Sequence, residues 1–260
     1  MRPTRVDNQT MDMVRSVTRD EAGKSGPVRM LVETVLLIVV AVVLAIVVKT
    51  FFVQAFYIPS ASMEPGLRGG PGSPVNDRIL VEKPSYWGSG PSRGDIVVFK
   101  DPGGWLPAEE DAGPTSATSS FLAKIGLYPA GGHLVKRVIG VAGDTIVCCD
   151  KQGRISVNGH PLDEKSYIAP QSQCNGPMAG CSGWSATVPP GRIFVMGDNR
   201  GESADSSCHL SVKGKPSACQ PDDAFVPVSD VVGRVFAVVW PAGDAKWIHR
   251  PATFASVPNP

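Results

Sequence analysis

The most prominent pattern in the chain is a charge-free apolar segment near the N-terminus. Residues 34–48 read TVLLIVVAVVLAIVV and hold no charged side chain. A helix needs ~20 apolar residues to cross the hydrocarbon core of a bilayer, and apolar residues at 31–32 and 51–53 extend the segment to about that length. Because the run is apolar on every side, it differs from a helix that covers a soluble core with one face. We predict a transmembrane helix over residues 30–53.

The residues that flank this segment indicate how it lies in the membrane. A cleaved signal peptide would end in a small-residue cleavage site, and residues 53–55 (VQA) match that pattern poorly. Residues 1–29 are polar and mixed in charge, which predicts a disordered tail. The basic side chains of this tail are Arg2, Arg5, Arg15, Arg19, Lys24 and Arg29. Since positive residues stay on the cytoplasmic side, we predict a single-pass protein of the plasma membrane with a cytoplasmic N-terminus and an extracytoplasmic domain.

Beyond residue 53 the chain alternates between short β-type runs and turns rich in Gly and Pro. The runs with the strongest β character are residues 78–83, 95–99, 133–141, 145–148, 154–157, 192–196 and 231–240. The pair Asn158-Gly159 is a hairpin signal. We see no convincing amphipathic helical pattern after the anchor. The sequence therefore predicts a mainly β domain, built as a coiled antiparallel sheet or an open barrel.

Composition also predicts where the domain begins and ends. We expect one extracytoplasmic β-rich domain over residues 54–250, followed by a C-terminal tail over 251–260. Exposed insertions are predicted where Gly, Pro, Ser and other small or polar residues gather, at about 101–132, 169–190 and 207–227.

Charge and cysteine content narrow the function. The chain has 25 Lys+Arg against 24 Asp+Glu, so no strongly basic surface points to nucleic acid. The four histidines and six cysteines form neither an HExxH nor a CxxC motif, and we predict no metal and no cofactor. Outside the cytoplasm the cysteines would form disulfides. Proximity in sequence favours Cys174–Cys181 and Cys208–Cys219, which leaves Cys148 and Cys149 as a vicinal pair or with other partners.

Three stretches could carry chemistry, and each has a simpler explanation. The turn with Ser60 and Ser62 could be a linker between anchor and domain. Lys136 lies in a β-type run, where a lysine often protects an edge strand from aggregation; in apolar surroundings its pKa could instead fall from about 10.4 to the 7–8 or so that a general base needs. Residues 197–206 (GDNRGESADS) have the composition of a polar turn. The residue types alone leave these alternatives open.

Taken together and in order, these stretches resemble bacterial type I signal peptidase. The resemblance spans residues 56–241 apart from the insertions, and it is carried by IPSASMEPGL, NDRILVEK, GDIVVF, LVKRVIGVAGD and MGDNRGESADS. Each motif alone is weak, but five in order are specific. The resemblance implies a membrane-anchored serine endopeptidase that removes signal peptides from exported preproteins after small residues. It implies signal peptides, membrane lipid and the protein-export machinery as partners.

The same resemblance implies a role for individual residues. Ser62 is the expected nucleophile and Lys136 the expected general base, a serine–lysine version of nucleophile-plus-base catalysis. Ser60, with the Ser62 backbone N–H, is expected to hold the oxyanion. Ser203 is expected to orient the Lys136 amine, and Asp205 to support its loop.

Further positions follow by the same correspondence. Asp198 and Arg137 are expected to be structural, and Phe56, Ile58 and Val135 to line the pockets for substrate side chains. His133, close to Lys136 in sequence, is expected to be a bystander.

One departure and one rival hypothesis remain. Signal peptidases often carry Arg directly after the Ser-Ala-Asp-Ser run, where this chain has Ser207. A salt link from that position to Asp205 is therefore in doubt. The rival hypothesis is a membrane-anchored β domain that binds peptide or cell-wall material without catalysis, in which Ser62 and Lys136 would be ordinary surface residues.

Overall fold

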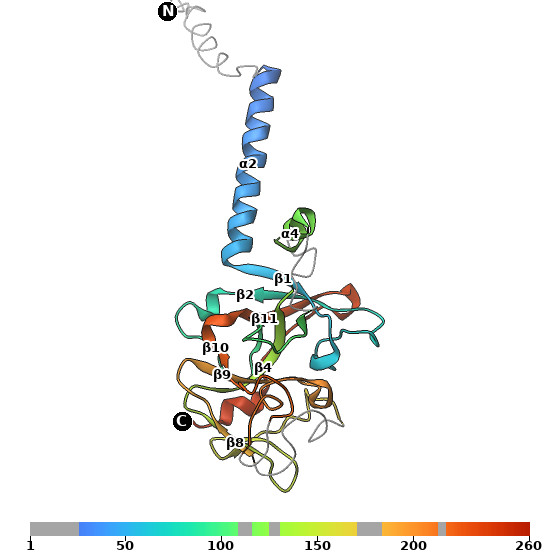
Figure 1. The fold of residues 1–260 in the computed structure, drawn as a ribbon. Helices are drawn as coiled ribbons and strands as arrows, with labels where there is room; N and C mark the ends of the chain where they lie inside the picture. Colours follow the sequence, from blue (N-terminus) through green and yellow to red (C-terminus); the bar gives the residue numbers. More distant parts are fainter. Residues whose placement is uncertain (1–25, 109–115, 125–130, 171–183, 213–216) are drawn as a thin grey trace, which may run out of the picture. The chain divides into compact units, whose positions relative to one another are not determined.

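The structure, a computed structural model, describes residues 26–108, 116–124, 131–170, 184–212 and 217–260. The chain divides by its contacts into two units, Met1–Val47 and Val48–Pro260. Figure 1 shows the ribbon, in which one long helix is followed by a domain made mostly of strands.

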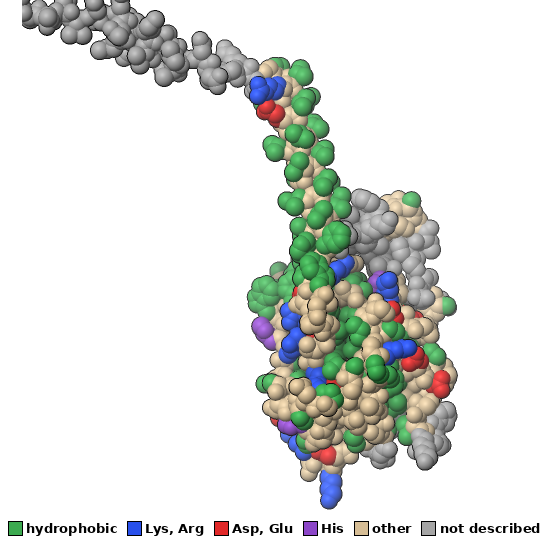
Figure 2. All heavy atoms as spheres, turned by 90° about the vertical axis from the view of Figure 1, so that its left-hand side faces the viewer, with side chains coloured by type: hydrophobic (Ala, Val, Ile, Leu, Met, Phe, Trp, Pro, Cys, Tyr) green, Lys and Arg blue, Asp and Glu red, His purple; other side chains and the backbone are tan. Residues whose placement is uncertain are grey.

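The long helix α2 spans Pro27–Phe51. Its part from Pro27 to Val48 is long and apolar enough to cross a membrane, and Figure 2 shows hydrophobic side chains covering its middle. Arg29 and Glu33 form an ion pair of 2.9 Å one turn apart, close to the helix N-terminus. The predicted apolar helix is therefore present. It starts at Pro27, before the predicted residue 30. A backbone N–H in the first helical turn has no intrahelical acceptor, so proline costs no hydrogen bond there.

The domain is built on an antiparallel sheet in the order β1-β2-β11-β3-β4-β9-β10, with β12 paired to β11. Its strands are β1 Val53–Tyr57, β2 Arg78–Glu82, β3 Ile96–Lys100, β4 His133–Val141, β9 Arg192–Met196, β10 Val226–Pro227, β11 Val231–Trp240 and β12 Lys246–Trp247. A smaller antiparallel sheet has the order β7-β6-β5-β8. Its strands are β5 Thr145–Cys148, β6 Ser156–Val157, β7 His160–Pro161 and β8 Trp184–Thr187. In the described residues β1 and β10, at the two ends of the main order, do not pair with each other, so the sheet is not closed. The predicted fold class is confirmed.

Apolar residues on either side of strand β4 fix the position of the site. Leu134 and Val138 belong to one buried cluster, with Val97 and Val195. Val135, one position along, packs against a second cluster. This alternation is the period of two that a strand imposes on its side chains.

Short helices connect the strands. Most are single 3-10 turns: η1 Ala61–Met63, η2 Pro84–Tyr86, η3 Arg200–Glu202, η4 Val228–Asp230, η5 Ala242–Asp244 and η6 Ala252–Ser256. The α-helix α4, Ala117–Lys124, is an element that the sequence did not predict. At eight residues it is too short to show a clear amphipathic period.

All three predicted insertions contribute to the core, contrary to expectation; in the third, Leu210 and Ala224 are buried. Trp105 is 6% exposed and donates its indole N–H to the Asp223 carbonyl. Trp184, in the stretch predicted as the second insertion, begins β8 and is 1% exposed. In the first two insertions a single large aromatic side chain buries enough apolar surface to hold a Gly- and Ser-rich stretch against the domain.

The last ten residues are not a free tail either. Phe254 and Val257 are buried in the cluster beneath the smaller sheet. The Arg93 guanidinium donates to the Val257 carbonyl and Asn158 donates to that of Pro258. The domain therefore continues past residue 250.

Candidate active site

The serine turn leaves strand β1 and folds back on the domain through η1. Ser62 is 6% exposed and Met63 1% exposed, whereas Ser60 lies at the surface. The Ser62 carbonyl accepts from the Asn199 backbone N–H at 3.1 Å, and the Ala61 carbonyl accepts from the Asn199 side-chain amide at 3.2 Å. The turn is thus fixed from behind by the loop that follows β9.

Lys136 comes from the middle of β4 and meets this turn. Its Nζ lies 2.7 Å from Ser62 Oγ, although the two residues are 74 positions apart in the chain. The lysine is 4% exposed. Ser60 Oγ lies 3.2 Å from Ser62 Oγ on the other side. The nucleophile candidate is therefore flanked by one amine and one hydroxyl.

Burial alters the acid–base behaviour of this lysine. Desolvation lowers the pKa of Lys136 to about 8, against the carboxylates of Asp205 and Asp198, which raise it. Removing a cation from water is unfavourable, so the neutral amine gains relative to the charged one. A substantial fraction of the amine is therefore neutral near physiological pH, as a general base requires.

Asp205, whose carboxylate acts on the lysine, is held by hydrogen bonds and not by an ion pair in the described residues. It is fully buried and accepts from the Gly197 backbone N–H at 2.9 Å. Its other carboxylate oxygen accepts from the Ser207 N–H at 3.0 Å and the Ser207 hydroxyl at 2.7 Å. In the described part of the chain Asp205 makes no ion pair; hydrogen bonds from Ser207 stand where the resemblance would place an arginine. We call Ser62, Lys136, Asp205 and Ser207 the lysine site.

A set of paired charges adjoins the lysine site. Arg137 donates through Nε and Nη2 to the two oxygens of Asp198, at 2.8 and 2.6 Å. Arg200 pairs with Glu164 at 2.5 and 3.1 Å and donates through Nε to the Gly197 carbonyl at 2.9 Å. All of these side chains are buried. With Tyr167, described below, we call them the arginine network.

Comparison with known proteins gives a consistent assignment. The family model described as "Signal peptidase, peptidase S26" matches residues 31–240. The chain belongs to the signal peptidase family. It is 39% identical to the probable signal peptidase I of Mycobacterium leprae over 83% of this chain and 77% of that protein. It is 40% identical to the signal peptidase I of Mycobacterium tuberculosis over 83% of this chain and 74% of that protein.

More distant relatives carry the same description. A probable signal peptidase I-2 of Synechocystis is 34% identical over 88% of this chain and 83% of that protein. The crystal structure of a signal peptidase I from Enterococcus faecalis V583 covers 55% of this chain and 95% of its own, at 23% identity and a TM-score of 0.31. As a signal peptidase the chain is a serine endopeptidase, and its substrates are exported preproteins that carry signal peptides.

Within this signal peptidase, Ser203 makes no hydrogen bond to the lysine in the described residues. Its hydroxyl is buried and makes no hydrogen bond within the described residues. It lies instead against Gly197, where an added Cβ would collide with Ser203 Oγ and with the Ser62 carbonyl. Gly197 must therefore be glycine for the two loops to approach. The orienting role of Ser203 stays a prediction.

The predicted pocket residues do come together. Ile58 is 2% exposed in a cluster with Met63, and Phe56 and Val135 are partly buried against the same cluster. The His133 ring lies beside Phe56, with a centroid separation of 5.5 Å. The three predicted residues thus share one apolar cluster with Met63, the neighbour of Ser62 in the chain.

Two members of the arginine network were not found from the sequence. Glu164 is 6% exposed and accepts from the Tyr167 hydroxyl at 2.6 Å, while the Arg137 guanidinium lies 4.4 Å from the centre of the Tyr167 ring. Both belong to a stretch interpreted only as the continuation of a hairpin. Arg200 belongs to the motif MGDNRGESADS, but the resemblance assigns it no role. Its position in that motif was the one sequence signal, and it did not identify a partner 36 positions away.

The cysteines form two disulfides in the described residues. One joins Cys208 to Cys219, as predicted, and the other joins the neighbours Cys148 and Cys149. Cys174 and Cys181 lie outside the described residues. The Cys208–Cys219 bond closes the loop that directly follows Asp205 and Ser207.

Proposed function

We propose that this signal peptidase cuts with Ser62 as nucleophile and neutral Lys136 as general base. The observation that carries the proposal is the 2.7 Å approach of Lys136 Nζ to Ser62 Oγ, in a setting where burial lowers the pKa of the amine to about 8. A serine hydroxyl is a weak nucleophile until an adjacent base takes its proton. Lys136 is the one base within hydrogen-bond distance of Ser62 in the described part of the chain.

The reaction proceeds in two stages. The amine of Lys136 takes the hydroxyl proton as Ser62 Oγ attacks the scissile carbonyl. Lys136 then gives this proton to the departing amine. The signal peptide stays bound to Ser62 through an ester. In the second stage Lys136 takes a proton from water as the water oxygen attacks the ester, and it then gives that proton to Ser62 Oγ, which releases the signal peptide.

Ser60 can stabilise the negative charge that develops on the carbonyl oxygen during attack. Its hydroxyl lies 3.2 Å from Ser62 Oγ at the open side of the turn. With the Ser62 backbone N–H it would form an oxyanion hole, in which one donor contributes about 10²–10³-fold in rate in comparable sites.

We further propose that Phe56, Ile58 and Val135 select small side chains before the cut. They present an apolar surface that is already packed, which leaves room only for shallow pockets. The substrate is expected to bind extended along a strand of the domain.

The anchor gives this arrangement its place in the cell. We propose that α2 crosses the plasma membrane with the N-terminus in the cytoplasm and the domain outside. A signal peptide embedded in the same bilayer would then meet Ser62 at high effective concentration. The protein-export machinery remains a predicted partner.

Cleavage of a preprotein by the full-length chain in detergent tests the dyad. Ser62→Ala and Lys136→Ala should each remove activity, while Ser229→Ala and Lys100→Ala, at exposed positions, should leave it unchanged. Undiminished cleavage by both site variants would refute the mechanism. Peptide binding that survives in all four variants without any cleavage by the parent chain would favour the non-catalytic alternative.

A further inference from the structure

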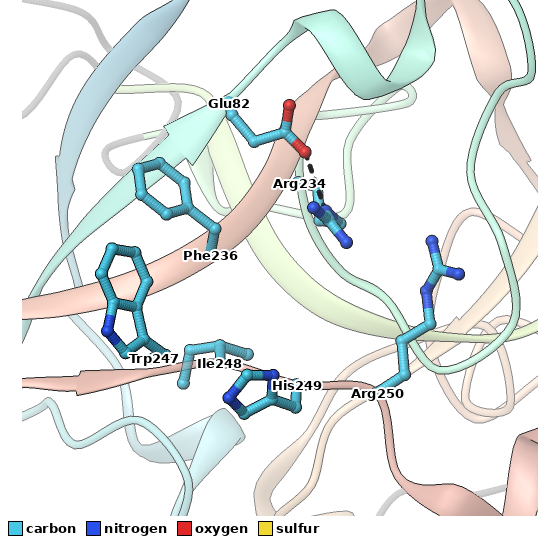
Figure 3. Close-up of a pocket in the computed structure, with 7 residues that line it drawn as sticks. All are labelled: Glu82, Arg234, Phe236, Trp247, Ile248, His249 and Arg250. Atoms are coloured by element: carbon cyan, nitrogen blue, oxygen red, sulfur yellow. Dashed lines mark hydrogen bonds and ion pairs between the residues drawn. The ribbon is translucent and has the colours of Figure 1, made fainter.

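A separate pocket lies on the domain, formed by the last residue of β2, the middle of β11 and the segment that begins with Trp247 of β12. It is open to solvent and has a volume of about 440 Å³. Figure 3 shows the guanidinium groups of Arg234 and Arg250 on one side of this pocket and the rings of Phe236 and Trp247 on the other. None of these four residues belongs to the lysine site or the arginine network.

The two arginines are each held by one carboxylate and keep N–H groups for a ligand. Arg234 Nε donates to Glu82 at 2.8 Å, and in the described part of the chain that is its one hydrogen bond, so both Nη groups are open. Arg250 donates through Nε and Nη2 to the buried Asp95, at 2.5 and 3.2 Å, which leaves Nη1. The carboxylates orient both guanidinium groups. Planar groups with several fixed donors are well matched to phosphate oxygens.

The opposite wall of the pocket is aromatic and open to solvent. Phe236 and Trp247 stack with a centroid separation of 5.9 Å, and Trp247 is 69% exposed. An indole ring with one apolar face and one polar N–H is typical of the boundary between bilayer and water. A ligand that satisfies both walls carries a phosphate group next to an apolar portion.

The strand register places this pocket next to the point where the chain leaves α2. Glu82 lies opposite Val53, which follows the last residue of the helix by two positions, and opposite Arg234 on its other side. Arg234 in turn lies opposite Val97, and Val97 opposite Lys136. Neighbouring strands are about 4.8 Å apart. Arg234 is therefore about 10 Å from the backbone of Val53 and about 10 Å from that of Lys136.

We propose that this pocket binds the phosphate group of an anionic phospholipid from the bilayer that holds α2. The glycerol and the start of an acyl chain lie along Phe236 and Trp247. One bound lipid then fixes the sheet at the bilayer surface, on the same rung as the catalytic lysine. The proposal requires α2 to lie in a membrane, but it does not depend on the chemistry of Ser62.

A phospholipid fits the pocket better than a free anion does. The charges of Arg234 and Arg250 are balanced by Glu82 and Asp95, so charge alone binds any anion weakly, and a ligand that also packs on the aromatic wall has the advantage. A second exposed aromatic pair lies near the start of β1. Trp87 is 64% exposed and its ring lies 5.6 Å from that of Phe52, the residue that follows α2.

Tryptophan quenching in nanodiscs tests the proposal. The full chain is reconstituted in phosphatidylcholine that contains a minor fraction of either brominated phosphatidylglycerol or brominated phosphatidylcholine. Bromine quenches indole fluorescence at short range, and the part due to Trp247 is the difference between the parent chain and Trp247→Phe. We expect half-maximal quenching of Trp247 at about tenfold less brominated phosphatidylglycerol than phosphatidylcholine. Both lipids carry the phosphate, but only phosphatidylcholine brings a choline cation next to the two arginines, and like charges repel.

Two variants should change the preference for phosphatidylglycerol in opposite directions. Arg234→Gln should abolish the preference, while Glu82→Gln should strengthen it by freeing Arg234 from its carboxylate. The matched control is Arg192→Gln, because the Arg192 side chain is 36% exposed and ion-paired, against 33% for Arg234, but lies on β9. If Arg234→Gln fails to fold, Glu82→Gln alone still decides the matter.

Four results would overturn the proposal. Equal quenching by both lipids would mean that Trp247 merely rests on the bilayer, and absence of quenching would mean that the pocket does not reach it. A preference that survives in Arg234→Gln would place the anion elsewhere. Loss of the preference on addition of inorganic phosphate at constant ionic strength would assign the pocket to a soluble anion. Since the readout is fluorescence, none of these depends on whether the serine–lysine dyad is correct.

Discussion

Lys136 and Arg137 are neighbours on one strand, yet their charges are balanced in opposite ways. Arg137 meets Asp198 through two short hydrogen bonds. Lys136 meets a neutral hydroxyl at 2.7 Å, and its nearest carboxylates act on it without an ion pair in the described residues. Because successive side chains of a strand point to opposite faces, a single residue step separates a fixed ion pair from an amine that is easily deprotonated.

The contrast teaches what each cluster contributes. Paired buried charges hold the loop after β9 in place, since both Arg137 and Arg200 bind groups at its start. An unpaired buried amine contributes no such stability, because burial penalises its charged form. The arginine network therefore supports the turn that faces Ser62, and the lysine site, which we propose carries the reaction, is formed at a cost in stability.

The largest effect is expected from Lys136→Met, in two properties at once. The kcat/KM for a preprotein should fall by about 10⁴-fold or more, because the base is lost. Stability should rise: a pKa of about 8 in the folded chain, against 10.5 for a free lysine, corresponds to about 3 kcal/mol at 1.36 kcal/mol per pH unit. Below pH 8 both states bind the proton and the whole penalty applies; it disappears as the pH rises toward 10.5.

Denaturant unfolding of the full chain in detergent, at neutral and at alkaline pH, measures this gain. Lys100→Met serves as the control, because Lys100 is an exposed lysine at the end of the adjacent strand. A Lys136→Met chain that is less stable than the parent at neutral pH would show that the lysine is a structural residue, contrary to the contrast drawn above.

How much of this could be predicted depends on how local each signal is. The anchor and the strands follow from runs of a few residues, and Ser62 and Lys136 from short motifs that stand in a fixed order. The burial of Lys136 could not be predicted, since it arises from η1 and the loop after β9, which fold over the strand from distant parts of the chain. Motif order indicated which residues meet, but not what surrounds them.

The missed residues share the same physical cause. Glu164 finds Arg200 across 36 positions, and Trp105 stacks on His209 with a centroid separation of 4.4 Å. Neither pair shows a helical or strand period that would announce it. Phe254 was assigned to a tail because it stands alone among polar and small residues, yet one aromatic side chain is enough to fix a short segment.

Breaking the arginine network should have the next largest effect, and in the opposite direction from Lys136→Met. Arg200→Met leaves the Glu164 carboxylate buried without its cation, which typically costs 3–5 kcal/mol or so. Adding Glu164→Gln should recover part of this loss, because the orphaned charge is removed. Denaturant unfolding of the two single variants and the double variant gives the coupling energy. A loss below about 1 kcal/mol for Arg200→Met would place this pair with weak surface ion pairs.

A smaller, more specific effect is expected from Asp205→Asn. The Asp205 carboxylate raises the pKa of Lys136, so its removal lowers that pKa further. Since the neutral amine is the proposed active form, the acid limb of the kcat/KM profile should move to lower pH. A pH–rate series that brackets about 8 measures it.

Asp222→Asn, at an exposed aspartate, provides the comparison for this variant and should leave the limb where it is. Asp198→Asn is a poorer test, because it also removes the partner of Arg137. An unmoved acid limb in Asp205→Asn would mean that this carboxylate does not act on the lysine.

The smallest effect is expected from Ser207→Ala. This variant tests whether the Ser207 hydroxyl only holds Asp205 in position or also keeps its carboxylate ionised. The variant removes one of three donors and keeps the two backbone N–H groups, so stability should fall by about 1 kcal/mol. Ser207→Thr, which keeps the hydroxyl, should recover part of that loss. Asp205 stays ionised, so the acid limb should stay at the parent pH. If Ser207→Ala moved the acid limb as far as Asp205→Asn does, the Ser207 hydroxyl would be setting the charge of Asp205. The lysine site would then need all three hydrogen-bond donors to keep the Asp205 carboxylate ionised, because no cation pairs with it in the described residues.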